Sequence, residues 1–178
     1  MKFIINYILL SVICSLLPHP KIRAIYLRLL GATIGSNVRI ENVFFIQFQY
    51  SIRNLHCNDN VHIGTNTILD LSEKIFIEKY VGVGPGCTIL THQNFGEYHG
   101  NVLSTIYKTK YLPVVLSEHA IIGADTTILA GSTVGRCSLV GAKSLVNGDI
   151  PANALAFGNP ARVIKDHGPL LPPSEVPK

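Results

Sequence analysis

Aliphatic side chains recur at every sixth position in the second half of this chain of 178 residues. The unbroken run is Leu116, Ile122, Ile128, Val134, Val140 and Val146. The residues four places after the first five are all small: Ala120, Thr126, Ser132, Ser138 and Ser144. Neither a helix nor an alternating strand has a period of six. Three flat faces joined by tight corners, each with one large and one small inward side chain, account for the pattern, which therefore predicts a parallel β-helix.

The corners of such a coil should fall three places after the inward aliphatic residue. A sharp corner favours residues that tolerate a left-handed backbone, chiefly Gly, Asn and Asp. Residues of this kind stand at the expected places: Asn37, Asn66, Gly86, Asp125 and Gly131. Cys137 and Lys143 are exceptions, so the corner rule is a bias.

Two shorter runs of sixes extend the coil toward the N-terminus. They are Ile34, Ile40, Ile46 and Ile52, and then Ile77, Val83 and Ile89. The phase is expected to slip around residues 56–60 and again around residues 71–74. We therefore predict an apolar helical segment at 1–30, the coil at 31–150 with an extruded loop at 93–113, and a C-terminal segment with an irregular tail at 151–178. A loop of about twenty residues inside a compact domain is more often functional than idle.

The N-terminus is almost wholly apolar over residues 3–17, where two prolines follow. Fifteen residues fall short of the roughly twenty that span a bilayer. A single Lys ahead of the segment and the lack of a small-residue cleavage site fit a signal peptide poorly. Two interpretations stay open: a helix packed on the domain or between subunits, and an interfacial helix with Lys21, Arg23 and Arg28 near lipid headgroups.

Composition narrows the compartment and the partners. The net charge is +4 and there is no long run of Lys or Arg, which argues against a nucleic-acid partner. The four cysteines lie far apart without CxxC spacing. The sequence predicts a reduced, cytoplasmic setting. Peripheral contact with the inner face of the cytoplasmic membrane through residues 3–17 is part of the same prediction.

Two stretches resemble a known family. They are "VGAKSLVNGDIPANALAFGNPARVIK" at 140–165 and "ILDLSEKIFIEKYVGVGPGCTILTH" at 68–92. Both resemble the hexapeptide-repeat acyltransferases, and the second resembles the sugar O-acetyltransferases of the galactoside, maltose and capsule or exopolysaccharide types. The resemblance implies an all-β, left-handed parallel β-helix that forms a homotrimer. It also implies transfer of an acetyl group from acetyl-CoA, as co-substrate, to a hydroxyl or amine held between neighbouring coils.

The resemblance places the catalytic position at His92, directly before the predicted loop. The chemistry asks for such a residue independently, because a sugar hydroxyl must lose its proton as it attacks a thioester, and histidine titrates near the working pH. Backbone amides could stabilise the oxyanion. No acyl-enzyme is required, so Cys87, at a small inward position, is interpreted as a buried structural thiol.

Other polar residues are candidates for the acceptor side. Asp70 matches an aspartate of the sugar-acetylating relatives that contacts the acceptor, and a structural turn aspartate is the alternative. His99, inside the loop, is expected to line the acceptor cleft or to have no role. Glu78 is a candidate partner to orient His92. His62 and His119 are expected to face solvent or an interface.

The coenzyme side rests on the resemblance alone. Ala124 and Ala142 match turns whose backbone faces the pantetheine arm, and Asn147 stands where relatives often carry Thr. Arg162 and Lys165 match basic residues near the nucleotide phosphates, where cationic groups suit a phosphorylated ligand.

The predicted function is acetyl-CoA-dependent O-acetylation of a sugar hydroxyl in surface polysaccharide biosynthesis. N-acetylation of an amino sugar is an alternative. A carbonic anhydrase of the γ class needs three histidines converging on a metal, and His92, His99 and His119 do not resemble that arrangement. A non-catalytic β-helix scaffold is the third alternative. No metal site is predicted.

Overall fold

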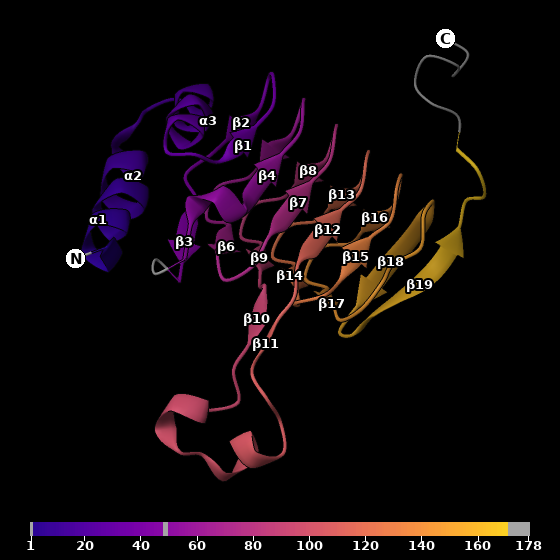
Figure 1. The fold of residues 1–178 in the computed structure, drawn as a ribbon. Helices are drawn as coiled ribbons and strands as arrows, with labels where there is room; N and C mark the ends of the chain where they lie inside the picture. The colour runs from indigo at the N-terminus through magenta and orange to yellow at the C-terminus, as the bar shows by residue number, and fades with distance from the viewer. Residues whose placement is uncertain (1, 48–49, 171–178) are drawn as a thin grey trace.

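The computed structural model describes residues 2–47 and 50–170, and their main body is a three-sided coil of short strands (Figure 1). Sheet A contains, in spatial order, β1 (Thr33–Ile34), β4 (Leu55–Cys57), β7 (Ile75–Ile77), β12 (Val114–Leu116) and β15 (Thr133–Val134). Sheet B contains β2 (Arg39–Ile40), β5 (His62–Ile63), β8 (Gly82–Val83), β13 (Ile121–Ile122), β16 (Leu139–Val140), β18 (Ala154–Gly158) and β19 (Ala161–Asp166). Sheet C contains β3 (Phe44–Ile46), β6 (Ile68–Asp70), β9 (Thr88–Ile89), β14 (Thr127–Ile128) and β17 (Leu145–Val146).

All strand pairs within these sheets are parallel except the last, between β18 and β19. Apart from β18 and β19, consecutive strands of these three sheets belong to different sheets, so the chain winds around the prism and returns to the same face one coil later. The predicted left-handed parallel β-helix is confirmed.

The inward positions form the core as the repeat predicts. The six aliphatic residues from Leu116 to Val146 are each at most 1% exposed, and the five small residues between them at most 3%. Their stacking is in register, since Ile122 pairs with Val83 on one side and Val140 on the other. Cys87 is fully buried as predicted, and its burial raises the pKa of the thiol.

The first run of sixes keeps its phase only as far as Ile40. In sheet C the inward residue is Phe45, which aligns with Leu69, while Ile46 is half-buried beside it. The prediction that Ile46 points inward is wrong, because the corner after Ile40 is one residue shorter than a hexapeptide. The first slip of the six-residue phase therefore lies before β4. The predicted slip at residues 56–60 is wrong, because these residues already follow the regular repeat.

The longer connections gather along one edge of the prism. Sheet C turns into sheet A there, and the corners at residues 47–54, 71–74 and 90–113 all exceed a regular corner. The first includes η2 (Ile52–Asn54). The second explains the predicted slip, because Leu69 and Ile77 are eight residues apart. We call this edge, where each corner joins sheet C to sheet A, the C–A edge.

The third connection is the extruded loop, which leaves the body after His92 and returns at Val114 (Figure 1). Its base is an antiparallel pair, β10 (His92–Gln93) with β11 (Lys110–Tyr111). The rest holds η3 (Glu97–His99) and η4 (Val102–Thr105).

Corner geometry is imposed by the coil more than by residue preference. The five predicted corner residues have φ between 52° and 82°, and the two exceptions, Cys137 and Lys143, have φ of 56° and 59°. His119 and Tyr80 hold the same conformation and stack their rings 4.7 Å apart. A left-handed backbone costs an ordinary residue about 1 kcal/mol, so packing and hydrogen bonds of the coil offset that cost at each of these corners.

The N-terminal segment is helical and covers the open edge of the first coil. Its helices are α1 (Lys2–Tyr7), the π-helical η1 (Ile8–Ile13), α2 (Cys14–Leu16) and α3 (Pro20–Leu29). Pro20 begins α3 at a position where its missing N–H costs nothing. Leu10, Cys14 and Leu27 are buried against the body, and the Tyr26 hydroxyl donates to the Leu9 carbonyl over 3.1 Å. This cover protects strand edges that would otherwise invite aggregation.

None of the helices in the described residues has the length and apolar character needed to cross a membrane. The end of the predicted irregular tail, residues 171–178, lies outside the described residues.

Candidate active site

A fully buried carboxylate, Asp70, organises the C–A edge. It ends β6, next to the corner that is two residues longer than usual. Its Oδ1 accepts hydrogen bonds from the backbone N–H of Ser72 at 2.9 Å and from the Ser72 hydroxyl at 2.6 Å. Its Oδ2 accepts from the backbone N–H groups of Thr91 at 2.9 Å and His92 at 3.1 Å. The long corner thus bends the chain so that several donors converge on one carboxylate.

The same carboxylate fixes the imidazole of His92. The His92 Nδ1 atom lies 2.5 Å from Asp70 Oδ2 and 3.2 Å from the Ser72 hydroxyl. Since Asp70 is a pure acceptor when ionised, the hydrogen-bond network assigns the proton to Nδ1. The Nε2 atom then carries a lone pair, and the Gln47 side-chain amide lies 3.3 Å from it. A histidine held in this tautomer is arranged to accept a proton at Nε2.

Asp70 is ionised despite its burial. Burial is the largest single influence and would raise the pKa of the carboxyl, but the hydrogen bonds from Ser72, His92 and Thr91 together outweigh it and hold the pKa below its usual range. The group therefore stays negative at neutral pH, where it favours the Nδ1 proton and would stabilise an imidazolium.

A pH dependence of stability follows from the lowered pKa of Asp70. Because that pKa is lower in the folded than in the unfolded state, its stabilising contribution is present above the ordinary value of 3.8 and is lost as the pH falls through the folded value. We expect wild type to resist urea better than Asp70→Asn at about pH 6, and the difference to shrink at about pH 3. Equal midpoints of the two proteins at about pH 6 would contradict this expectation.

Two predicted roles differ from the structure. Glu78 does not orient His92, because it lies at the corner between sheets A and B, where its carboxylate accepts from the backbone N–H of Glu118 at 2.8 Å. Asp70 takes the orienting place. Its predicted contact with the acceptor does not match a carboxylate that is fully buried and engaged by protein donors through both oxygens.

Aromatic rings flank the open side of His92. Tyr111, on the returning strand of the loop, lies with its ring centroid 6.2 Å from that of His92 and nearly parallel to it. Tyr50 follows at 5.9 Å from Tyr111. Tyr111 is 38% exposed, so an apolar and partly open surface adjoins the imidazole.

No family model matches the chain, whereas individual proteins resemble it over most of its length. A protein of Escherichia coli (strain K12) named as a candidate colanic acid biosynthesis acetyltransferase, WcaF, is 31% identical over 144 residues, which are 81% of this chain and 74% of that protein. The chain belongs to the hexapeptide-repeat acetyltransferases.

Two other members of the hexapeptide-repeat acetyltransferases widen the comparison. The galactoside O-acetyltransferase of Lactococcus lactis subsp. lactis (strain IL1403) is 31% identical over 137 residues, 77% of this chain, and the match spans 64% of that protein's length. A solved galactoside acetyltransferase in complex with coenzyme A superposes with a TM-score of 0.63 at 25% identity, covering 93% of this chain and 80% of that one.

The residues expected to face the coenzyme fall into three places. Ala124 and Ala142 occupy successive turns of the edge between sheets B and C, and the Ala124 carbonyl accepts from the backbone N–H of Lys143 at 2.8 Å. These turns stack so closely that a Cβ on Gly123 would lie 2.4 Å from the Ala142 nitrogen. Asn147 is exposed at the C–A edge, the edge that holds His92.

The remaining predicted residues are exposed. Arg162 and Lys165 lie on β19 at the end of sheet B, and the Arg162 guanidinium donates to the neighbouring Ala161 carbonyl at 3.0 Å. His99 is exposed within the loop, and no hydrogen bond joins it to His92 in the described residues. His62 is exposed beside Glu41, with Nε2 3.7 Å from the carboxylate.

Within residues 2–47 and 50–170, no three His, Cys, Asp or Glu side chains come together as a metal would require. The three histidines weighed for a γ-class carbonic anhydrase are separated, since His92 binds Asp70, His99 lies in the loop and His119 stacks on Tyr80.

Several residues of the site escaped sequence reasoning. Ser72 had a readable signal, because it lies two places after Asp70 inside a predicted phase slip. Gln47 and Tyr111 had none: they are 45 residues before and 19 residues after His92, and only the coil brings them to the same edge. Gln47 also has a left-handed φ of 62°, an unusual conformation for a side-chain-bearing residue.

Proposed function

We propose that this chain transfers an acetyl group from acetyl-CoA to a saccharide hydroxyl, with His92 as the general base. The observation that carries the proposal is the buried Asp70 carboxylate 2.5 Å from His92 Nδ1, which makes Nε2 the basic nitrogen of the ring at the C–A edge. The family, and the acetyltransferase names of the relatives, support acetyl transfer.

In the proposed reaction each proton movement passes through His92. His92 Nε2 accepts the proton of the acceptor hydroxyl as its oxygen attacks the thioester carbonyl, forming the tetrahedral intermediate. The carbon–sulfur bond then breaks, the thiolate of coenzyme A leaves, and the imidazolium returns the proton to sulfur. Asp70 stays ionised throughout, holding the imidazole in place and stabilising its positive charge. Backbone N–H groups of the coil would stabilise the oxyanion.

The acceptor side fits a sugar ring. Tyr111 presents a partly exposed aromatic surface beside His92, and sites for small molecules combine apolar or aromatic walls with a few polar groups. A galactoside and colanic acid are the saccharides that the relatives' names give. We propose a surface polysaccharide or its precursor as the acceptor here.

We propose a homotrimer as the assembled form. The outer face of sheet B carries the neighbouring exposed side chains Ile121 and Leu139, 43% and 40% exposed, on paired strands. Apolar residues on a sheet face suit burial against a second copy. An acceptor made at the membrane would also suit peripheral contact through residues 3–17 and a cytoplasmic location at the inner face of the cytoplasmic membrane.

The coenzyme side is tested by calorimetric titration with acetyl-CoA. Replacing Arg162 with alanine should weaken binding about tenfold, because a charge-assisted hydrogen bond to phosphate is lost. Arg136→Ala, which removes a half-buried arginine paired with Glu118 at 3.5 Å, is the matched control and should bind as wild type does.

Acetyl transfer is then measured with galactosides, oligosaccharides of surface polysaccharides and an amino sugar as acceptors. Acetylated saccharide formed by wild type would support the function, and product only from the amino sugar would reassign it to N-acetylation. A folded wild-type protein that binds no acetyl-CoA would overturn the proposal.

A further inference from the structure

The positive charge of the chain is concentrated at its N-terminus. Residues 1–40 contain five Lys or Arg residues and no Asp or Glu, whereas the rest of the chain contains ten basic and eleven acidic residues. The whole net charge therefore belongs to the segment that contains the N-terminal helices and the first two strands, β1 and β2. Such asymmetry indicates an anionic partner for this end of the molecule.

Helix α3 presents an apolar strip bordered by basic side chains to solvent. Pro20, Arg23, Ala24 and Leu27 form its buried side. The opposite side is exposed and consists of Lys21, Ile22, Ile25, Arg28 and Leu29. At 100° per residue these five fall on one continuous arc, with Arg28 and Lys21 at one border and Leu29 and Ile22 at the other. Leu29 is 80% exposed, which is costly for a leucine unless something covers it.

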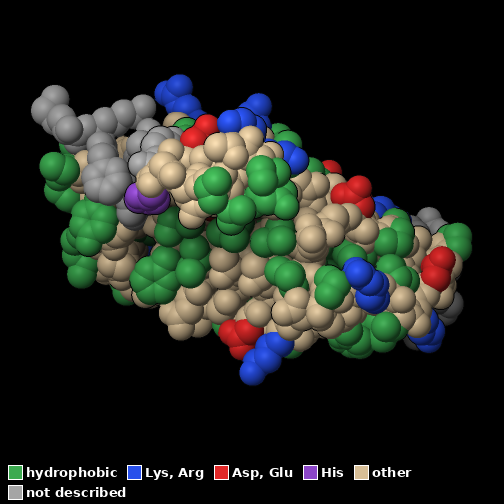
Figure 2. Space-filling view, turned by 90° about the horizontal axis from the view of Figure 1, so that it is seen from below, with side chains coloured by type: hydrophobic (Ala, Val, Ile, Leu, Met, Phe, Trp, Pro, Cys, Tyr) green, Lys and Arg blue, Asp and Glu red, His purple; other side chains and the backbone are tan. Residues whose placement is uncertain are grey.

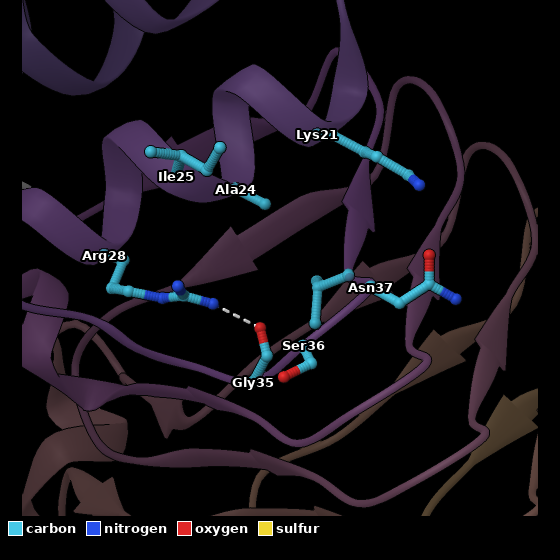
Figure 3. Close-up of a pocket in the computed structure, with 8 residues that line it drawn as sticks. Lys21, Ala24, Ile25, Arg28, Gly35, Ser36 and Asn37 are labelled. Atoms are coloured by element: carbon cyan, nitrogen blue, oxygen red, sulfur yellow. Dashed lines mark hydrogen bonds between the residues drawn. The ribbon is translucent and has the colours of Figure 1, made fainter.

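The basic border of this strip opens into a hollow of about 360 Å³ between α3 and the corner that follows β1 (Figure 3). Lys21 and Arg28 lie on either side of Ile25, and both extend toward the turn at residues 35–37. The Arg28 guanidinium donates to the Gly35 carbonyl, which holds it at the rim. Two cations beside a polar turn form a setting for a phosphate group.

One of the three basic residues expected near lipid headgroups, Arg23, does not face solvent. Arg23 is buried and its guanidinium faces Glu41, with 4.0 Å between Nη1 and Oε2. The prediction that Arg23 lies near headgroups is therefore wrong. Lys21 and Arg28 keep their exposed positions, and no acidic residue precedes Glu41 in the sequence.

The preceding helices also carry exposed apolar side chains. Ile4, Ile8, Val12 and Leu16 are 42–76% exposed in the described part of α1, η1 and α2. Figure 2 shows hydrophobic side chains gathered at the end of the molecule that these helices form. Exposed apolar side chains on a basic end of the molecule match the composition of interfacial membrane helices.

We propose that the N-terminal helices bind an anionic lipid surface, with the exposed strip of α3 inserted among the lipids and a headgroup phosphate held by Lys21 and Arg28. The charge decides between a lipid surface and a second copy of the chain, because like-charged basic ends repel each other, while anionic headgroups attract them. Binding of this kind would hold the coil at the membrane without a membrane-spanning helix.

The test is flotation of the full chain with vesicles of phosphatidylcholine alone and of phosphatidylcholine mixed with phosphatidylglycerol. Wild type should float with the anionic vesicles, and salt should weaken this binding. The double variant Lys21→Glu/Arg28→Glu should bind about twentyfold or more weakly, since each basic residue near such a surface contributes about fivefold. The separate variant Ile25→Ser/Leu29→Ser should also bind the anionic vesicles several-fold more weakly, because membrane binding scales with the apolar area buried.

The matched control is Ile106→Ser/Lys108→Glu, which changes an exposed aliphatic residue and an exposed lysine on the extruded loop. It should float as wild type does. Thermal unfolding establishes whether each variant is folded. If the Lys21→Glu/Arg28→Glu variant is unfolded, vesicle binding by the Ile25→Ser/Leu29→Ser variant still tests the proposal. The proposal would be overturned if wild type did not bind anionic vesicles, or if it floated equally well with vesicles of phosphatidylcholine alone. The proposal would also be overturned if the α3 variants bound anionic vesicles as wild type does. Unchanged vesicle binding together with dissociation of an oligomer would instead assign the strip to contacts between copies of the chain.

Discussion

Replacing His92 with alanine is expected to lower kcat for acetyl transfer by about a hundredfold to ten-thousandfold, the usual contribution of a positioned general base. Among the described residues of the site, His92 is the only proton acceptor whose ring is held in place by a buried carboxylate. Without it, the acceptor hydroxyl must lose its proton to water. Steady-state kinetics with acetyl-CoA and an accepted saccharide measure the loss.

The His92 variant should keep most of its affinity for acetyl-CoA, because of the residues proposed for the coenzyme only Asn147 shares the C–A edge with His92. Calorimetry on the same preparation checks this. A loss of acetyl-CoA binding equal to the loss of activity would show that His92 supports the binding site, and unchanged kcat would remove it from the mechanism.

Replacing Ser132 with arginine is expected to prevent folding. The side chain of Ser132 is 1% exposed inside the coil, where its hydroxyl accepts from the backbone N–H of Gly148 at 3.0 Å. The interior offers neither volume nor a counter-charge for a guanidinium, and burying an unpaired charge costs far more than the roughly 5–15 kcal/mol by which a domain is stable. We expect aggregated protein without a cooperative unfolding transition.

The adjacent variant Thr133→Arg is the matched control, because the Thr133 side chain lies on the outer face of β15. It should remain soluble with nearly wild-type thermal stability. A soluble Ser132→Arg protein that unfolds at the wild-type temperature would mean that the inward register is wrong.

The coil could be predicted from the sequence because its packing repeats. An inward residue such as Ile128 has an aliphatic neighbour one coil before, Ile89, and one coil after, Val146, so the pattern itself carries the register. Prediction failed where the repeat changes length, as at Ile46. A corner that is one residue shorter cannot be recognised when an aliphatic residue also stands at the sixth position. It also failed to foresee left-handed corners at Tyr80 and Lys143, whose residue types do not favour that backbone.

The site was predictable only in part. His92 is predicted from its motif, but the partner of its imidazole is not, since Glu78 and Asp70 are both carboxylates within a few residues of a phase slip. Which of them meets His92 depends on the edge of the prism to which each belongs. Ser72, whose hydroxyl and backbone N–H both bind Asp70, belongs to the same irregular corner.

The central claim is that Asp70 acts through His92, and the kinetics of Asp70→Asn test it most directly. We predict that kcat falls about a hundredfold or more while KM for the saccharide and the affinity for acetyl-CoA change little, because an amide cannot hold the Nδ1–H tautomer or stabilise the imidazolium. Thermal unfolding of the variant confirms that it is folded. A raised KM for the saccharide with unchanged kcat would contradict the claim and return Asp70 to the acceptor contact that the sequence suggested.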